Sequence, residues 1–350
     1  MRLIRVVLPV LVVSVAACGT MGTDAGLDAG ADASDSGLVD AGSFDAGSLD
    51  AGTDGGLTSA EAACVDGGWA HASLTIGGLE RSLLWRGPPA QWTQGAIIVL
   101  HGGGGRASDF CSGGPLVQPQ VAFTSQAIAR GFAVFVLDST DGLVTDAQGR
   151  PCGKRFDFSV LPRANLDLPF IDHVGQQFIP SVRPTGSAQQ RFLTGLSTGG
   201  YMTIRAATAL DAWVTAFAPV SAGDPYGTDT LCDPALSPRD SAVGILVDRE
   251  TRLEITEDGA CASDAGMPNE STWDTTHPAQ RPGFRQFHHA SDGIVDLSCM
   301  QKANAQLLAH GYPGAAPALV PPAAAKSPLL HLWLNVYNQP LLDAFDSYTP

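Results

Sequence analysis

The chain has 350 residues, a hydrophobic fraction of 44% and a net charge of −15. This length and apolar content suit one large folded domain with a full core. Eight aspartates between residues 23 and 57 account for about half of this charge, so the acidity says little about the substrate of the folded part. We expect no nucleic-acid partner.

The first residues have the pattern of an export signal. Met1–Arg5 carries two arginines, and Val6–Val15 is an apolar run too short for a spanning helix. Val15–Cys18 also resembles a bacterial lipobox, in which the cysteine is lipidated. We therefore predict a signal peptide over residues 1–17 and a lipid anchor on Cys18, which would hold an exported protein on a membrane at the cell surface or the periplasmic face. An ordinary signal peptide with an unmodified cysteine is the alternative.

A low-complexity segment follows the predicted signal. Between residues 23 and 57 there is no basic residue, and the triplet Asp-Ala-Gly recurs at Asp24, Asp28, Asp40, Asp45 and Asp50. Such a segment cannot bury enough apolar surface to offset its ordering entropy. We predict a disordered linker over residues 18–63 and a folded domain over residues 64–350. The spacing fits neither an EF-hand loop nor the nonapeptide repeat, so calcium binding is not expected.

Six cysteines fall in the predicted domain: Cys64, Cys111, Cys152, Cys232, Cys261 and Cys299. An even number in an exported chain indicates disulfides rather than thiol chemistry. The sequence has no Cys-x-x-Cys pair and no cysteine with a histidine at ligand spacing, so we expect no metal site. All pairings remain open, and we favour Cys111–Cys152 because both residues follow predicted strands.

Short apolar runs alternate with helical patterns through this domain. Strands are predicted at residues 69–76, 80–85, 96–100, 132–137, 191–196, 213–220 and 284–288. Helices are predicted at residues 122–129, 166–178, 201–210, 296–310 and 339–345. This alternation predicts an α/β domain with a mainly parallel sheet covered by helices on both faces. Residues 223–282 lack periodicity, so we interpret them as an insertion that forms a lid or a loop on the substrate side.

The most specific motif is Gly-x-Ser-x-Gly at residues 195–199. A strand pattern leads into it and a helical pattern leads out, which is the context in which this motif exposes a serine hydroxyl. Glycines at both ends remove β-carbons that would collide in so tight a turn. We predict Ser197 as a nucleophile and the backbone N–H of Thr198 as a donor to an oxyanion.

A serine hydroxyl needs a histidine base and a carboxylate that orients the histidine. In chains with this turn the order is serine, acid, histidine. Asp292 follows a predicted strand, at the edge where open α/β sheets place their active sites. Asp248, after the apolar run Gly244–Val247, is the alternative acid. Of the eight histidines, His331 lies near the C-terminus and after the acid, so we predict it as the base. Its alternative role is that of a packed histidine in an apolar stretch.

A glycine run, Gly102–Gly105, follows His101 and the buried strand. Glycines let the backbone approach a substrate, and preorganised N–H donors stabilise an oxyanion. We predict Gly103, or a neighbouring glycine, as the second donor. The sequence contains neither a Walker lysine nor a dinucleotide-binding glycine pattern with its downstream acid, so we expect no phosphate site and no cofactor.

These motifs resemble the α/β-hydrolase superfamily. The resemblance extends over residues 68–348, and four segments carry it: Leu100–Asp109, Gly195–Met202, His288–Val295 and His331–Trp333. It implies an α/β-hydrolase fold with Ser197 as nucleophile, Asp292 as orienting acid and His331 as base. It also implies Gly103 and Thr198 as oxyanion donors.

Within the superfamily, the chain resembles the secreted polyhydroxybutyrate depolymerase and feruloyl or acetylxylan esterase group. The features are Ala107–Phe110 after the glycine run, the doubled Gly199-Gly200, and the triplet His331-Leu332-Trp333. The chain departs from the group at Pro321–Ala325, where a strand ending in Gly-Gly-His would be expected.

Together these features predict an exported serine hydrolase that cleaves carboxylic esters of polyester or plant-wall acyl type. A peptidase of prolyl oligopeptidase-like type is one alternative, because Gly-x-Ser-x-Gly-Gly-Tyr also resembles that group. A non-catalytic surface protein on a hydrolase scaffold is another. We expect Trp333 to bind substrate and, with residues 223–282, to wall the pocket.

The anchor prediction can be tested directly. Cys18→Ala should move the protein from the membrane fraction to a soluble secreted form, because the thioether lipid could no longer be attached. Cell fractionation with an antibody measures this. Equal membrane association of the variant and the parent would contradict lipidation at Cys18.

Overall fold

The computed structural model describes residues 57–146, 149, 151, 153–158, 163–226, 246–252, 254–255 and 281–348. The predicted signal peptide, Cys18, most of the predicted linker, Cys152, Cys232 and Cys261 lie outside the described residues. Within the described ranges, no helix combines the length and the apolar character that crossing a bilayer requires.

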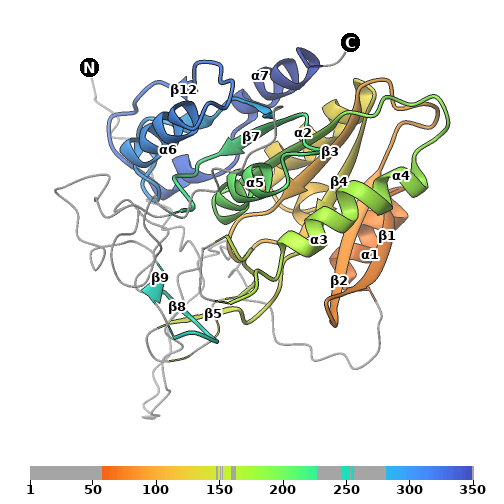
Figure 1. Ribbon diagram of the computed structural model, residues 1–350, viewed down its shortest axis with the longest axis horizontal. Helices are drawn as coiled ribbons and strands as arrows, with labels where there is room; N and C mark the ends of the chain where they lie inside the picture. The colour runs from red at the N-terminus through yellow and green to blue at the C-terminus, as the bar shows by residue number, and fades with distance from the viewer. Residues whose placement is uncertain are drawn as a thin grey trace, which may run out of the picture.

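The centre of the described structure is a mixed sheet of nine strands (Figure 1). The strands are β1 (Ala70–Ile76), β2 (Leu79–Arg86), β3 (Gly95–Leu100), β4 (Phe132–Leu137), β6 (Arg191–Leu196), β7 (Ala216–Val220), β10 (Gly283–Phe284), β11 (Phe287–His289) and β12 (Ala318–Val320). They lie in the order β1-β2-β4-β3-β6-β7-β11-β12, and β10 pairs with β7. β2 is antiparallel to both of its neighbours, and every other pair in the sheet is parallel.

This strand order, with a serine turn after β6, is that of the α/β-hydrolase fold. The predicted fold class is therefore confirmed. The strand predicted at residues 284–288 proves to be two short strands, β10 and β11.

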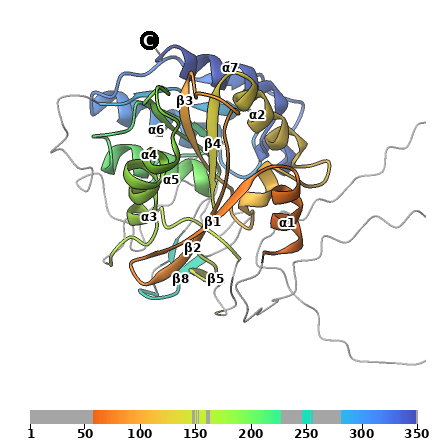
Figure 2. The ribbon, with the colours of Figure 1, turned by 90° about the vertical axis from the view of Figure 1, so that its right-hand side faces the viewer.

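Helices cover both faces of the sheet, as the alternation of strands and helices predicts. They are α1 (Ser59–Asp66), α2 (Gln118–Ala129), α3 (Leu168–His173), α4 (Ile179–Val182), α5 (Thr198–Ala209), α6 (Leu297–Ala309) and α7 (Asn335–Asp346). Figure 2 shows α1 and α2 on one side of the sheet and α3, α4 and α5 on the other. The residues of β3 alternate between two apolar clusters: Ile97 and Val99 pack towards α2 and α7, whereas Ile98 and Leu100 pack towards α3 and α5.

A second, three-stranded sheet stands apart from the first. It consists of β5 (Val144–Asp146), β8 (Leu246–Asp248) and β9 (Glu254–Ile255) in antiparallel order. The predicted irregular insertion at residues 223–282 therefore contains two strands. Strands of two or three residues are too short to show alternation, which is why the sequence pattern did not reveal them.

Near the start of the described chain, α1 extends across the predicted domain boundary at Cys64, which lies within the helix. Thr58 and Glu61 cap this helix reciprocally, since each side chain bonds to the backbone N–H of the other residue. The helix carries Cys64 to a position 5.5 Å, Cα to Cα, from Cys111, and the two residues form a disulfide.

The predicted Cys111–Cys152 pairing is therefore wrong. Cys111 ends the 3₁₀ helix Ala107–Phe110, against which α1 packs, so its partner comes from the N-terminal helix. The spacing of the cysteines gave no sign of this contact, because α1 itself was not predicted. Cys299 is also disulfide-bonded.

This cross-link closes a loop of 47 residues in sequence separation. Replacing both Cys64 and Cys111 by serine should lower the free energy of unfolding by about 2–4 kcal/mol, because the unfolded chain gains freedom. Chemical denaturation under non-reducing conditions measures this. The matched control is Ser125→Ala on the exposed face of α2, which should change the same quantity by less than about 0.5 kcal/mol. An unchanged unfolding midpoint in the double variant would contradict a stabilising cross-link.

Candidate functional site

Ser197 occupies a strained turn between β6 and α5. Its backbone has φ 54° and ψ −120°, a conformation that residues other than glycine rarely adopt. Its N–H donates to the carbonyl of Val220 in β7 at 3.0 Å, and its own carbonyl accepts from Tyr201 at 2.8 Å. β6 ends at Leu196 and α5 begins at Thr198, so the whole turn between strand and helix is made by Ser197.

The surrounding glycines are required by close approach of the backbone. A β-carbon at Gly199 would collide with the carbonyl oxygen of Leu100 at the end of β3, and one at Gly195 would lie 2.8 Å from that oxygen. At Gly200 a β-carbon would lie 2.6 Å from the carbonyl oxygen of Val220. The turn therefore packs backbone to backbone against the ends of the two strands that flank β6.

The glycine loop, Gly102–Gly105, lies beside this turn. A β-carbon at Gly103 would lie 3.3 Å from Cγ2 of Thr198. The N–H groups of Gly104 and Gly105 already donate to backbone carbonyls, at 2.8 and 3.0 Å, so neither glycine is a suitable donor to a substrate. Thr198 is the first residue of α5, and N–H groups of a first helical turn have no partner within the helix. Gly103 and Thr198 are therefore neighbours, and their roles as oxyanion donors stay predictions.

Asp292 and His331 form a buried, directed pair. Nδ1 of His331 lies 2.9 Å from Oδ2 of Asp292, and both residues are almost fully buried. Oδ1 of Asp292 accepts the backbone N–H groups of Ile294 and Val295 at 2.8 and 3.0 Å. Burial alone would raise the pKa of this carboxyl, but His331 and the backbone donors more than offset it, and the pKa is lowered. The carboxylate is therefore charged and holds Nδ1–H, which leaves Nε2 of His331 as the basic nitrogen.

Backbone pairing holds the histidine segment against the acid loop. His331 ends the 3₁₀ helix Pro328–His331, which follows Ser327. Asp292 and Ser327 form a parallel β-bridge, and the N–H of Gly293 donates to the carbonyl of Ser327 at 3.1 Å. A β-carbon at Gly293 would lie 2.6 Å from the carbonyl carbon of Ser327. A strand does precede this segment, as the resemblance led us to expect: β12 pairs with β11 in parallel and ends at Val320, and the loop Pro321–Ala325 separates it from the bridge.

The serine and the acid–histidine pair lie at one edge of the sheet. β6, β7 and β11 are neighbouring parallel strands, so their carboxyl ends share an edge. Ser197 follows β6 and Asp292 follows β11. Ser221, which follows β7, links them: its N–H donates to the carbonyl of Phe287 in β11 at 2.9 Å. Ser221 also has a positive φ of 50°, so two of the three strand ends are strained.

A second histidine, His288, lies next to the acid and was not predicted. Its Nε2 is 3.1 Å from the carbonyl oxygen of Val295 and 3.8 Å from Oδ2 of Asp292. Burial lowers the pKa of His288, so the ring is neutral and donates from Nε2 to the carbonyl. Its position four residues before Asp292 carries no motif that could have assigned it this place.

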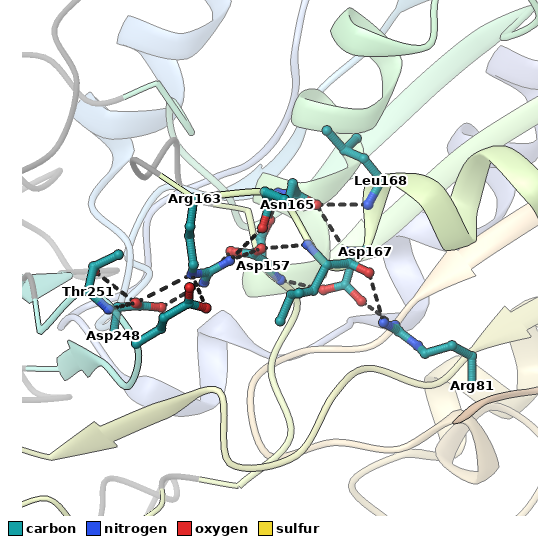
Figure 3. A network of polar contacts seen from close by, with 11 residues as sticks. Arg81, Asp157, Arg163, Asn165, Asp167, Leu168, Asp248 and Thr251 are labelled. Carbon is teal, nitrogen blue, oxygen red and sulfur yellow. Dashed lines mark hydrogen bonds and ion pairs between the residues drawn. The ribbon is translucent and has the colours of Figure 1, made fainter. Parts of the chain in front are cut away.

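Asp248, the alternative acid, is bound elsewhere. Figure 3 shows Arg163 between Asp157 and Asp248. The guanidinium contacts each carboxylate at 2.6 Å, and Thr251 donates to Asp248 from its backbone and its hydroxyl. Because its oxygens are occupied by this network, the structure pairs His331 with Asp292 and not with Asp248.

Trp333 does not line a binding site. Its side chain is 1% exposed and packs between Phe110 and Phe123, with ring centroids 5.7 and 4.9 Å away. Its indole N–H donates to Asn338 at 2.7 Å. The predicted substrate contact is therefore wrong: two residues after His331 the chain has already turned into the core beneath α2 and α7.

Among the described residues, no group of three or more histidine, cysteine, aspartate or glutamate side chains is arranged to hold a metal ion. Cys18, the predicted lipidation site, lies outside those residues.

No protein-family model and no curated protein matches this chain. Several solved structures are similar to it. A lipase/esterase from Lactobacillus plantarum is 14% identical with a TM-score of 0.47, over 80% of this chain and 97% of that one. The fluorophosphonate-binding serine hydrolase F of Staphylococcus aureus is 14% identical with a TM-score of 0.47, over 81% and 99% of the two chains. An acylaminoacyl peptidase of Pyrococcus horikoshii is 14% identical with a TM-score of 0.48, and the match covers 80% of this chain but only 41% of the peptidase. The fold assignment stands on the strand order and the turn geometry described above.

Proposed function

We propose that this protein is a serine hydrolase that cleaves carboxylic esters through an acyl-enzyme. The observation that carries the proposal is the hydrogen bond of 2.9 Å between Asp292 and His331, formed at the same sheet edge as the strained Ser197. A histidine held by a carboxylate near a serine on such a turn is the arrangement that activates a hydroxyl.

Each residue has a definite role in the reaction. Ser197 attacks the carbonyl carbon of the ester, and Nε2 of His331 takes the hydroxyl proton. Asp292 holds Nδ1–H and stabilises the imidazolium that forms. The imidazolium then gives its proton to the leaving alcohol, which leaves an acyl group on Ser197. A water molecule, deprotonated by the same nitrogen, releases the acid and restores the serine.

The developing negative charge on the carbonyl oxygen requires N–H donors that are already in place. Gly103 and Thr198 are the candidates, because they lie side by side and because the other N–H groups of the glycine loop, those of Gly104 and Gly105, are engaged. In acyl-transfer enzymes each such preorganised donor lowers the barrier by about 3–4 kcal/mol.

The substrate class and the cellular location are part of this proposal. The motifs after the glycine run and after the serine resemble the polyhydroxybutyrate depolymerase and feruloyl or acetylxylan esterase group, which favours a polyester or a plant-wall acyl ester. The export signal and Cys18 favour a lipid-anchored protein that acts outside the cytoplasm. A serine peptidase is the second candidate, because the same triad hydrolyses amides.

The nucleophile can be tested on the purified domain. Ser197→Ala should lower the hydrolysis of a short-chain nitrophenyl ester by at least about 10³-fold, because the attacking oxygen is lost. Its melting temperature should match that of the parent, since alanine removes only the hydroxyl. A peptide nitroanilide, assayed in parallel, separates esterase from peptidase activity. Ester turnover of the variant within tenfold of the parent would exclude Ser197 from the mechanism.

The choice of acid yields a paired prediction. Asp292→Asn should lower kcat by roughly 10³–10⁴-fold, because an amide favours the wrong tautomer of His331. Asp248→Asn should instead lower the free energy of unfolding by about 1–3 kcal/mol, because Arg163 loses one of its charged partners, and kcat should stay within a few-fold.

Steady-state kinetics and denaturant unfolding of both variants measure these effects. The opposite outcome, a crippled Asp248→Asn and an active Asp292→Asn, would overturn the assignment of the acid and leave the serine and histidine assignments standing.

A further inference from the structure

A closed ring of contacts passes through the glycine loop. The backbone N–H of Gly104 donates to the carbonyl of Lys154 at 2.8 Å, and the ammonium group of the same lysine pairs with Oδ2 of Asp138. Oδ1 of Asp138 accepts the backbone N–H of Ala107 at 3.0 Å. The ring therefore begins and ends on the loop segment and passes through one ion pair outside it. We call these four residues, Gly104, Ala107, Asp138 and Lys154, the clasp.

His101 fixes the direction of one peptide inside this ring. Its Nε2 lies 3.1 Å from the backbone nitrogen of Ser139 and 3.4 Å from Oδ1 of Asp138. Its Nδ1 lies 2.7 Å from the carbonyl oxygen of Gly102, and because a carbonyl oxygen can only accept, Nδ1 donates to it. The carbonyl of Gly102 and the N–H of Gly103 belong to one planar trans peptide, so they point in opposite directions. Fixing the carbonyl consequently aims the N–H of Gly103 away from the imidazole.

The ion pair of the clasp is poorly screened by water. The side chain of Asp138 is 4% exposed, whereas that of Lys154 is 30% exposed. A buried carboxylate holds its partners more strongly than a surface one, because the local dielectric is low. Lys154 also belongs to a segment that covers the loop: Nη1 of the next residue, Arg155, would lie 3.0 Å from a β-carbon at Gly103.

We propose that Asp138 and Lys154 are positioning residues that hold the N–H of Gly103 in the geometry an oxyanion requires. A run of four glycines has no side chains to restrict it, and its backbone would otherwise sample many conformations. The rigidity that catalysis needs must therefore come from groups outside the loop, and the clasp supplies it. This inference rests on the proposed serine hydrolase function.

The test compares four variants with the parent: Lys154→Met and Asp138→Asn, which break the ion pair, Lys154→Arg, which keeps it, and Lys302→Met as a matched control. Lys302 lies on α6, which packs on β11. Two quantities are measured: kcat and KM for a short-chain nitrophenyl ester, and the inhibition constant of a trifluoromethyl ketone, which forms a tetrahedral adduct with a serine oxygen.

Lys154→Met and Asp138→Asn should lower kcat by about tenfold or more and should weaken the ketone by a similar factor, with KM changed less than about twofold. This split is expected because the oxyanion forms in the adduct and in the transition state but not in the bound ester. Lys154→Arg should recover most of the activity, and Lys302→Met should match the parent. Thermal melting identifies a variant that has merely lost its fold, and Asp138→Asn retains an acceptor for Ala107 if Lys154→Met proves unstable.

The outcomes separate the two proposals. If the parent cleaves the ester and Lys154→Met keeps kcat and ketone affinity within twofold, the clasp does not position the loop. The assignment of Ser197, Asp292 and His331 is unaffected by that result. If Lys154→Met and Asp138→Asn lower kcat, raise KM by a similar factor and also lower the melting temperature, the role of the ion pair is purely structural and the inference is overturned. A parent that cleaves no ester and does not react with the ketone would refute the proposed function itself.

Discussion

The backbone strain at Ser197 is the constraint on which the rest of the site depends. A positive φ at a residue other than glycine costs about 1–3 kcal/mol, and it persists only where the surroundings leave no alternative. Here β6 and α5 are both buried, and the reversal between them is fixed by bonds to Val220 and Tyr201. The backbone at Gly195 and Gly199 then comes so close to the end of β3 that the chain beyond β3 must pass directly beside the serine. The glycine loop is in the site because the turn is tight.

The acid side of the site is ordered by the backbone rather than by packing of side chains. Asp292 is satisfied on one oxygen by two backbone N–H groups and on the other by His331, so its carboxylate has a single favourable orientation. The bridge to Ser327 fixes the start of the short helix that ends at His331. Main-chain bonds therefore set both partners across the loop that separates β12 from Ser327. The two prolines and three alanines of Pro321–Ala325 thus form a loop after β12 and do not mark the loss of a strand.

The sequence was most informative where steric requirements are local. Continuous apolar runs located the central strands, since a strand buried on both faces must be apolar at every position. The serine turn could be recognised in the sequence because only glycine fits at its two ends. The chain order of serine, acid and histidine then restricted the candidates, although the choice between Asp292 and Asp248 needed the three-dimensional partners.

The errors lie where a role depends on contacts distant in sequence. The cross-link of Cys64 to Cys111 depends on α1, whose eight residues carry little periodicity. Trp333 looks like a pocket residue only while its neighbours Phe110 and Phe123 are unknown. Asp138 carried a usable signal, because it directly follows the buried strand β4 at the edge where functional groups gather. The sequence around its partner Lys154 gave no indication of this contact.

The buried ion pairs around Arg163 show why position alone does not identify a catalytic carboxylate. Arg163 joins Asp157 to Asp248 in β8, and Arg81 in β2 pairs with Asp167, so this network ties the small sheet and the main sheet to one connecting segment (Figure 3). Such buried pairs contribute little net stability, since desolvation of the charges offsets their attraction, but removing one partner is costly. They therefore act chiefly to hold the described parts of the connecting segment, residues 154–158 and 163–167, in place.

That segment runs from Lys154, which contacts the glycine loop, to Asp167, which precedes α3. Its two ends are thus anchored to different parts of the molecule, the oxyanion loop at one and the main sheet at the other. Asp248 ends a strand, Asp292 follows one, and both are buried, yet one faces a guanidinium and the other an imidazole. A guanidinium stays charged at every accessible pH and can only bind, whereas an imidazole can exchange a proton. The chemistry of the partner, rather than the place of the carboxylate in the fold, separates the anchor from the candidate catalytic acid.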